Sequence, residues 1–137
     1  MDGLERFIEA QAGVYEQAFA ELRAGRKRSH WMWFVFPQLA GLGTSPTARF
    51  YAIASPAEAR AYLAHPMLGP RLRDCVGALL GHRGRGAEAM LGPVDAIKLR
   101  SSMTLFEAVA DDPVPFAAVL DAFYGGGRDQ ATLRLLG

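Results

Sequence analysis

The residues best suited to chemistry in this chain lie in one interval, 22–57, that contains no Asp or Glu. The interval combines cations, aromatic rings and a few polar groups: Arg23, Arg26, Lys27, Arg28, His30, Trp31, Trp33, Phe34, Phe36, Gln38, Arg49 and Tyr51. Arg and Lys bind phosphate, and the flat faces of Trp and Tyr stack on bases. Cations beside aromatic rings therefore predict an anionic ligand that carries a planar group, such as a nucleotide.

A predicted helix start within the same interval offers a second place for an anion. Ser45 precedes Pro46, the arrangement of an N-cap followed by proline at the first helical position. Free amides and the helix dipole at such an end attract negative charge. We expect Ser45 and Gln38 to orient the ligand.

A lysine and two serines form a polar cluster on a later, otherwise apolar helix. On a helical wheel Lys98, Ser101 and Ser102 share one side. Serine competes for backbone hydrogen bonds in mid-helix, so two hydroxyls there need a reason. Two interpretations are open: the serines face a ligand, or they are small contacts between helices and Lys98 is solvated.

The tryptophans and the first basic run also have structural interpretations. Trp31 and Trp33 are typical of a core in a small helical domain, and in a helix they would point about 200° apart. Cations such as those at Arg23 to Arg28 favour a helix C-terminus whatever the function. The sequence does not decide which tryptophan faces the core.

No pattern for a metal, a cofactor or an activated nucleophile is present. The histidines and Cys75 lack the short spacings that place two metal ligands on one helix face. Cys75 lies in an apolar helical stripe, where a thiol is typically a small hydrophobic side chain. His65 and His82 have no acid nearby in the sequence to orient them. We expect no metal and no cofactor, and no catalytic residue is assigned.

Helices must position these residues, because Ala and Leu far outnumber Val, Ile and Thr. Apolar spacing, capping residues, Pro and Gly predict helices over 4–24, about 46–53, 56–64, 68–80, 93–109 and 116–123, and a last turn after Asp129. Gly13 can split the first of these helices in two. The aromatic run 31–36 resembles a strand, but a lone strand makes no sheet, so a short helix capped by Ser29 is predicted. We predict a compact, all-α single domain over 1–137 with about six to eight short helices.

Length and charge set the remaining bounds. A chain of 137 residues is enough for one domain with a real core. Its formal charge of +1 hides a basic middle: residues 22–100 hold twelve bases and four acids, whereas 1–21 and 101–137 are acidic. Nucleic acid is not an expected partner, because the net charge is near zero and the cations form no dense run. Without a signal-peptide pattern or a membrane-length apolar stretch, we expect a cytoplasmic protein and no membrane.

Several segments resemble the signature blocks of an uncharacterised bacterial family catalogued as domain of unknown function eighteen-ten. The blocks lie at 25–39, 45–53, 65–69 and 98–106, and the Lys-x-Ser-His-Trp-Met-Trp run at 27–33 is the specific one. The resemblance spans nearly the whole chain. It implies a small, mainly helical protein without an established activity.

A partial similarity runs to the NADAR group of ADP-ribose-handling N-glycosidases. Their Ser-Glu-His-x-x-x-Ala block and a helix ending in Lys-Phe have loose counterparts at 45–52 and 98–106. Pro46 and Thr47 stand where that block has Glu and His, and Leu105 replaces the Lys before Phe106. The similarity implies a ligand class and no catalytic residue.

Two functions follow from these observations. The first is a binder or N-glycosidase-like hydrolase of a phosphorylated, nucleotide-type small molecule such as an ADP-ribose derivative. Its expected ligand-binding residues are Lys27, His30, Trp31, Trp33, Gln38, Ser45, Tyr51, Lys98, Ser101 and Ser102. The alternative is a non-catalytic protein-interaction or adaptor module, whose acidic ends and basic middle dock to partners or form a homodimer.

Overall fold

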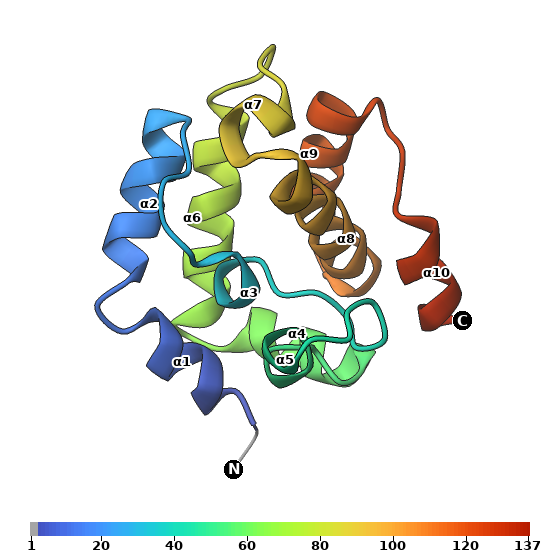
Figure 1. The fold of residues 1–137 in the computed structure, drawn as a ribbon. Coiled ribbons are helices and arrows are strands. Elements are labelled where there is room, and N and C mark those ends of the chain that lie inside the picture. Colours follow the sequence, from blue (N-terminus) through green and yellow to red (C-terminus); the bar gives the residue numbers. More distant parts are fainter. Residues whose placement is uncertain (1–2) are drawn as a thin grey trace.

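The computed structural model describes residues 3–137 as helices joined by short loops (Figure 1). In chain order they are α1 (Glu5–Gln11), α2 (Tyr15–Ala24), α3 (Met32–Val35), α4 (Pro46–Phe50), α5 (Pro56–Ala64), α6 (Leu68–Leu80), α7 (Ala87–Leu91), α8 (Pro93–Val109), α9 (Val114–Tyr124) and α10 (Gln130–Leu136). Within residues 3–137, β structure is limited to one isolated bridge between Leu39 and Ile53. The all-α prediction is confirmed.

The ten helices of the described chain exceed the six to eight predicted, for two reasons. Gly13 adopts a φ of 75°, in the left-handed region, and separates α1 from α2. Helix α7 has only five residues, too few for an apolar period to be recognised in the sequence. Gly92, with a φ of 88°, then separates α7 from α8.

Three helices begin at the capping side chains that the sequence predicts. Ser45 caps α4, Ser55 caps α5 and Asp129 caps α10, and each accepts a hydrogen bond from the backbone N–H three residues later. Proline occupies the first turn of α4, α5 and α8, where its missing N–H costs nothing. Local signals therefore locate these helix starts.

The predicted cap of α3 is wrong. Trp31, not Ser29, is the N-cap residue, and it makes no side-chain capping hydrogen bond. The Ser29 hydroxyl instead donates to the Glu21 carboxylate at 2.6 Å. A hydrogen bond to a residue eight positions earlier has replaced the predicted local cap.

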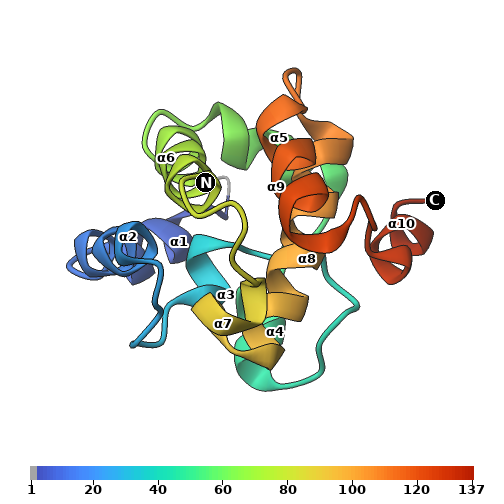
Figure 2. The ribbon, with the colours of Figure 1, turned by 90° about the horizontal axis from the view of Figure 1, so that it is seen from above.

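Helix α8 is the centre of the packing. Its residues Leu99, Met103, Leu105 and Phe106 are fully buried, and it contacts α5, α7, α9 and α10. Helices α2 and α6 pack together on one side, and α10 lies at the opposite edge of the molecule beyond α8 and α9 (Figure 2). No helix in the described part of the chain has both the length and the apolarity needed to cross a bilayer.

Two backbone hydrogen bonds close the base of the loop that contains α4. The Ala40 N–H donates to the Ile53 carbonyl and the Ile53 N–H donates to the Gln38 carbonyl, both at 2.8 Å. We call residues 40–52 the α4 loop. Because these hydrogen bonds fix both ends of the loop, α4 has a defined position relative to the rest of the domain.

Candidate functional site

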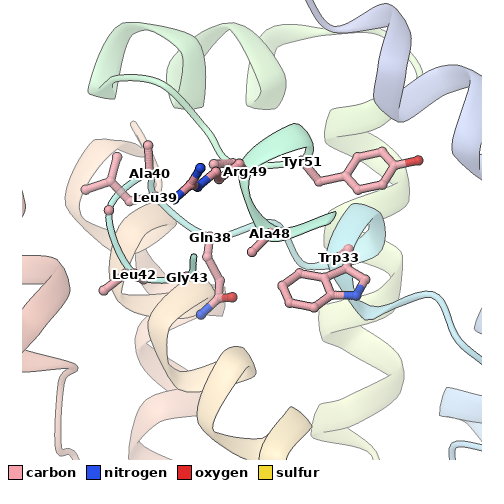
Figure 3. Close-up of a pocket in the computed structure, with 11 residues that line it drawn as sticks. Trp33, Gln38, Leu39, Ala40, Leu42, Gly43, Ala48, Arg49 and Tyr51 are labelled. Carbon is pink, nitrogen blue, oxygen red and sulfur yellow. The ribbon is translucent and has the colours of Figure 1, made fainter. Parts of the chain in front are cut away.

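A cleft with a volume of about 180 Å³ lies between α3 and the α4 loop (Figure 3). It is lined by Trp33, Gln38, Leu39, Ala40, Gly41, Leu42, Gly43, Ala48, Arg49, Tyr51 and Ala52. We call it the Trp33 cleft, because Trp33 alone comes from outside the 38–52 segment. The two hydrogen bonds at the base of the α4 loop therefore fix the segment that forms most of the wall of the cleft.

Three polar side chains of the Trp33 cleft have unused hydrogen-bonding groups. The Trp33 indole N–H, the Gln38 carboxamide and the Arg49 guanidinium make no hydrogen bond or ion pair with any residue of 3–137. Figure 3 shows the Trp33 indole and the Gln38 carboxamide on the same side, below Ala48, and the Arg49 guanidinium towards Leu39. Donors and acceptors left open beside an aromatic face suit a polar, planar ligand.

Tyr51 forms part of the wall of the cleft. Its ring packs against Phe34 and Phe50, with centroid distances of 5.4 and 4.8 Å. In Figure 3 its hydroxyl points away from Gln38 and Ala48. Tyr51 therefore supports the shape of the cleft more directly than it could bind a ligand with its hydroxyl.

A smaller pocket of about 80 Å³ adjoins Trp33 and contains two lysines that share one carboxylate. Asp95 lies 2.9 Å from the Lys27 ammonium and 3.5 Å from the Lys98 ammonium. The Lys98 ammonium is also 3.5 Å from the centroid of the Trp33 ring, a cation–π contact. With exposed His30 at its edge, this lysine pocket keeps a net positive charge although Asp95 neutralises part of it.

Glu21 fixes the backbone that leads into the lysine pocket. Glu21 is 4% exposed, and its carboxylate accepts hydrogen bonds from the backbone N–H groups of Arg28 and Ser29, the Ser29 hydroxyl, the Trp31 indole and the Gln17 amide. Burial by itself raises the pKa of Glu21, but these hydrogen bonds outweigh it and hold the pKa well below its usual range. Glu21 is thus an anion held by neutral donors, and we call this arrangement the Glu21 node.

The structure distinguishes the two tryptophans. Trp31 is fully buried and its indole N–H donates to Glu21 at 2.9 Å, so Trp31 belongs to the core. Trp33 is half-buried and lines both the Trp33 cleft and the lysine pocket. Trp33 is the tryptophan available to a ligand.

Most of the predicted ligand-binding residues come together around Trp33. Gln38 and Tyr51 line the cleft with it, and the remaining members of the group line the lysine pocket: Lys27, His30, Trp31 and Lys98. Residues far apart in the sequence therefore meet around Trp33. That they bind a ligand stays a prediction.

The predicted serines lie elsewhere. Ser45 is exposed and accepts the Ala48 N–H as the cap of α4. Ser101 and Ser102 are 3% and 0% exposed and line neither the cleft nor the lysine pocket. The Ser101 hydroxyl donates to the Ile97 carbonyl, whereas the Ser102 hydroxyl has no partner among the described residues. Of the two interpretations left open for these serines, the structure favours small contacts between helices.

Two residues at the site were not among those predicted. Asp95 stands three positions before Lys98, a spacing that places the two on one helix face and could have identified it. Arg49 lies in the carboxylate-free interval, but no sequence signal distinguishes it from the other cations there.

A wider groove of about 470 Å³ lies between α7, α8 and the end of α9, and none of the predicted residues lines it. Its polar groups are partly engaged: the Arg100 Nε donates to the Gly127 carbonyl and the Tyr124 hydroxyl donates to the Ala96 carbonyl. Burial also raises the pKa of the Tyr124 hydroxyl above its usual value, so it stays protonated. The Trp33 cleft, with its open polar groups, remains the better candidate site.

Comparisons with known proteins find relatives of the whole chain. The family described as "Protein of unknown function (DUF1810)" matches residues 1–136. The crystal structure of the conserved hypothetical protein Rv1873 from Mycobacterium tuberculosis is 56% identical, with a TM-score of 0.95 over 97% of this chain and 95% of that one. No curated protein matches. Sequence and fold are thus shared over almost the full length.

Proposed function

Since the chain belongs to DUF1810, a family of proteins of unknown function, we propose its function from the site itself: it binds a small molecule that has a planar group and an anionic group. Trp33 carries the proposal. Its ring borders both the cleft and the lysine pocket, with the Lys98 ammonium 3.5 Å from the ring centroid. A ligand that contacts Trp33 can therefore reach an aromatic face and a positive charge at once.

The planar group is expected in the Trp33 cleft. An indole face supplies stacking that tolerates different bases, and the Gln38 carboxamide can donate to or accept from the edge of a ring. Both side chains project on the same side of the cleft (Figure 3). Binding would give these open polar groups partners without breaking any bond of the fold.

The anionic group is expected at the lysine pocket. Lys27 and Lys98 carry two positive charges against the one negative charge of Asp95, and His30 lies exposed at the edge. Arg49, with no ion pair among the described residues, offers a further cation on the wall of the cleft. Phosphate or carboxylate groups satisfy such cations.

The dimensions favour a small ligand. Sites for drug-sized molecules enclose roughly 300–1,000 Å³, whereas the cleft has about 180 Å³ and the lysine pocket about 80 Å³. A mononucleotide fits this scale with part of it in solvent. A complete ADP-ribose derivative would extend beyond both pockets.

Binding is better supported than hydrolysis. The residues that line the Trp33 cleft include no Asp, Glu, His or Cys, the usual groups for acid–base or nucleophilic catalysis. Asp95 contacts two lysines, and both oxygens of Glu21 already accept hydrogen bonds. An N-glycosidase-like reaction stays a prediction to be tested alongside binding.

Calorimetry and thermal-shift measurements with AMP, adenosine, ADP-ribose and inorganic phosphate test the proposal. We expect AMP to raise the Tm and adenosine or phosphate alone to have a smaller effect. Trp33→Ala is expected to abolish the response, whereas Val114→Ala, an exposed apolar side chain of α9 that lines neither the cleft nor the lysine pocket, keeps it. No response to any of these compounds at millimolar concentration, or an equal response in Trp33→Ala, contradicts the proposal. Release of a free base from AMP, adenosine or ADP-ribose in the same samples would support the hydrolase function.

The wider groove is the observation that favours the alternative function, a protein-interaction module. Ile97, which lines the groove, is 66% exposed, and Val94, three positions earlier on the same face of α8, is 63% exposed. Size-exclusion chromatography at low and high salt tests this alternative. A salt-sensitive oligomer without any ligand response would support it over small-molecule binding.

A further inference from the structure

A second concentration of positive charge lies at the end of the molecule where α2 ends and the loop between α6 and α7 turns, at the top of Figure 1. It comprises Arg23 from the last turn of α2, Arg26 and Arg28 from the segment that follows α2, and Arg83 and Arg85 from the α6–α7 loop. All five are exposed. None of their guanidinium groups forms a hydrogen bond or an ion pair with a residue of 3–137. We call this group the arginine surface.

Two contacts bring the distant segments together. The His82 Nε2 lies 3.0 Å from the Leu22 carbonyl and 2.9 Å from the Arg23 carbonyl, so this nitrogen carries the hydrogen and donates to the end of α2. Gly25 has a φ of 73°, and a Cβ there would lie 2.0 Å from the Arg85 guanidinium and about 3 Å from the His82 ring. The positive φ favours glycine here, and the missing Cβ leaves room for the Arg85 and His82 side chains beside the backbone of residue 25.

Little negative charge offsets these arginines. Glu21 is the nearest acid on α2, but it is buried and both of its carboxylate oxygens accept hydrogen bonds from uncharged donors. It therefore forms no ion pair with these arginines. Glu88 faces the separate groove between α7 and α8. The arginine surface is therefore positive, although the whole chain carries only +1.

The composition of the arginine surface indicates the chemistry of its partner. Protein interfaces are organised around buried apolar or aromatic anchors. The exposed large apolar side chains of the described chain all lie elsewhere: Phe50, Met67, Val94, Ile97, Val114, Leu133 and Leu135. Binding to a polyanion needs no such anchor, because release of counterions from a phosphate backbone drives it. Arg also pairs with phosphate oxygens in a bidentate manner.

We propose that the arginine surface binds the phosphate backbone of a nucleic acid without reading its bases. The sequence argued against such a partner because its net charge is near zero and its cations form no dense run. The fold overturns the second reason, because His82 contacts the Leu22 carbonyl 60 positions away and so joins two short basic segments. This site is separate from the Trp33 cleft, and the proposal does not depend on the function of that cleft.

Fluorescence anisotropy with a labelled poly(U) RNA of about 20 nucleotides and a duplex DNA of similar length, at about 50 mM salt and above, tests the proposal. We expect binding to both, weakening as salt increases. The variant Arg83→Ala/Arg85→Ala is expected to bind about tenfold more weakly or worse, and to reduce the slope of log K against log salt by about 1.5.

The matched control is Arg60→Ala/Arg73→Ala, which removes the same charge from two exposed arginines of another pocket. It is expected to bind like the wild type, as is Trp33→Ala, and circular dichroism checks that every variant is folded. The proposal is overturned if the wild type does not bind at about 50 mM salt, or if the control loses as much affinity as Arg83→Ala/Arg85→Ala. Tighter binding to polyglutamate or to phosphatidylserine vesicles than to either nucleic acid would also overturn it and assign the surface to an acidic protein or a membrane.

Discussion

Trp31 and Trp33 are two positions apart, yet the polar groups around them are used in opposite ways. At the Glu21 node the Trp31 indole N–H and both carboxylate oxygens have partners, and the side chains are almost completely buried. At the Trp33 cleft the indole N–H and the Gln38 carboxamide have none among residues 3–137. Satisfied buried groups stabilise a fold, whereas open half-buried groups are available to a ligand. Substitutions at the two places should therefore separate stability from binding.

The largest effect is expected from Glu21→Gln. The new amide would present N–H groups to donors that now face carboxylate oxygens, and hydrogen bonds to a charged acceptor would be lost. We expect the free energy of unfolding to fall by about 3 kcal/mol at neutral pH. Urea denaturation measures it. Glu16→Gln, on the exposed side of the same helix, serves as the control and is expected to change it by less than about 0.5 kcal/mol. Equal effects of the two substitutions would show that the node is not a stabilising feature.

Acid should weaken the Glu21 node selectively. The folded-state pKa of Glu21 is below its usual range, so near pH 4 the unfolded chain binds more protons than the folded chain. The stabilisation is therefore complete above the ordinary carboxyl pKa and is lost as pH falls through and below it. Between about pH 6 and pH 3, the stability difference between wild type and Glu21→Gln is expected to shrink by on the order of 2 kcal/mol. Parallel urea curves at several pH values measure this, and a constant difference would contradict it.

Exchanging the tryptophans one at a time tests the comparison directly. Trp31→Phe removes a buried N–H donor and leaves a cavity, so we expect a loss of about 2–3 kcal/mol. Trp33→Phe is expected to cost less than about 1 kcal/mol, because the side chain is half-buried and its N–H is unbonded. With only two tryptophans in the chain, Trp31→Phe also leaves Trp33 as a fluorescent reporter, whose emission AMP should quench. Equal losses of stability would remove the distinction between core and cleft.

The smallest effect has the opposite sign. The Ser102 hydroxyl is fully buried and has no hydrogen-bond partner among residues 3–137. Ser102→Ala should stabilise the protein by up to about 1 kcal/mol, because it removes an unsatisfied polar group. Ser101→Ala, whose hydroxyl donates to Ile97, is the neighbouring control and is expected to be neutral or slightly destabilising. Thermal unfolding distinguishes them, and clear destabilisation by Ser102→Ala would show that this hydroxyl has a bound partner.

The candidate site was predictable in part. The carboxylate-free interval identifies Trp33 and Gln38, and the later polar cluster identifies Lys98, because residue type alone suggests a ligand for them. Asp95 was missed although its spacing from Lys98 places the two on one helix face. Arg49 was missed because only its position on the wall of the cleft distinguishes it from the other cations of the interval. The helical wheel places Ser101 and Ser102 beside Lys98, but it does not give the extent to which that side of the helix is buried.

The sequence by itself determined most of the helices. The starts of α5 and α8 and the end of α6 follow from caps, proline, glycine and apolar spacing, which act within about four residues along the chain. Only the tertiary structure decided that Trp31 is core and Trp33 is cleft, because a carboxylate ten residues away takes the Trp31 indole and the Ser29 hydroxyl. It also joined the arginines of two distant segments through His82 and Gly25. Burial and charge density depend on such long-range contacts, which no local pattern encodes.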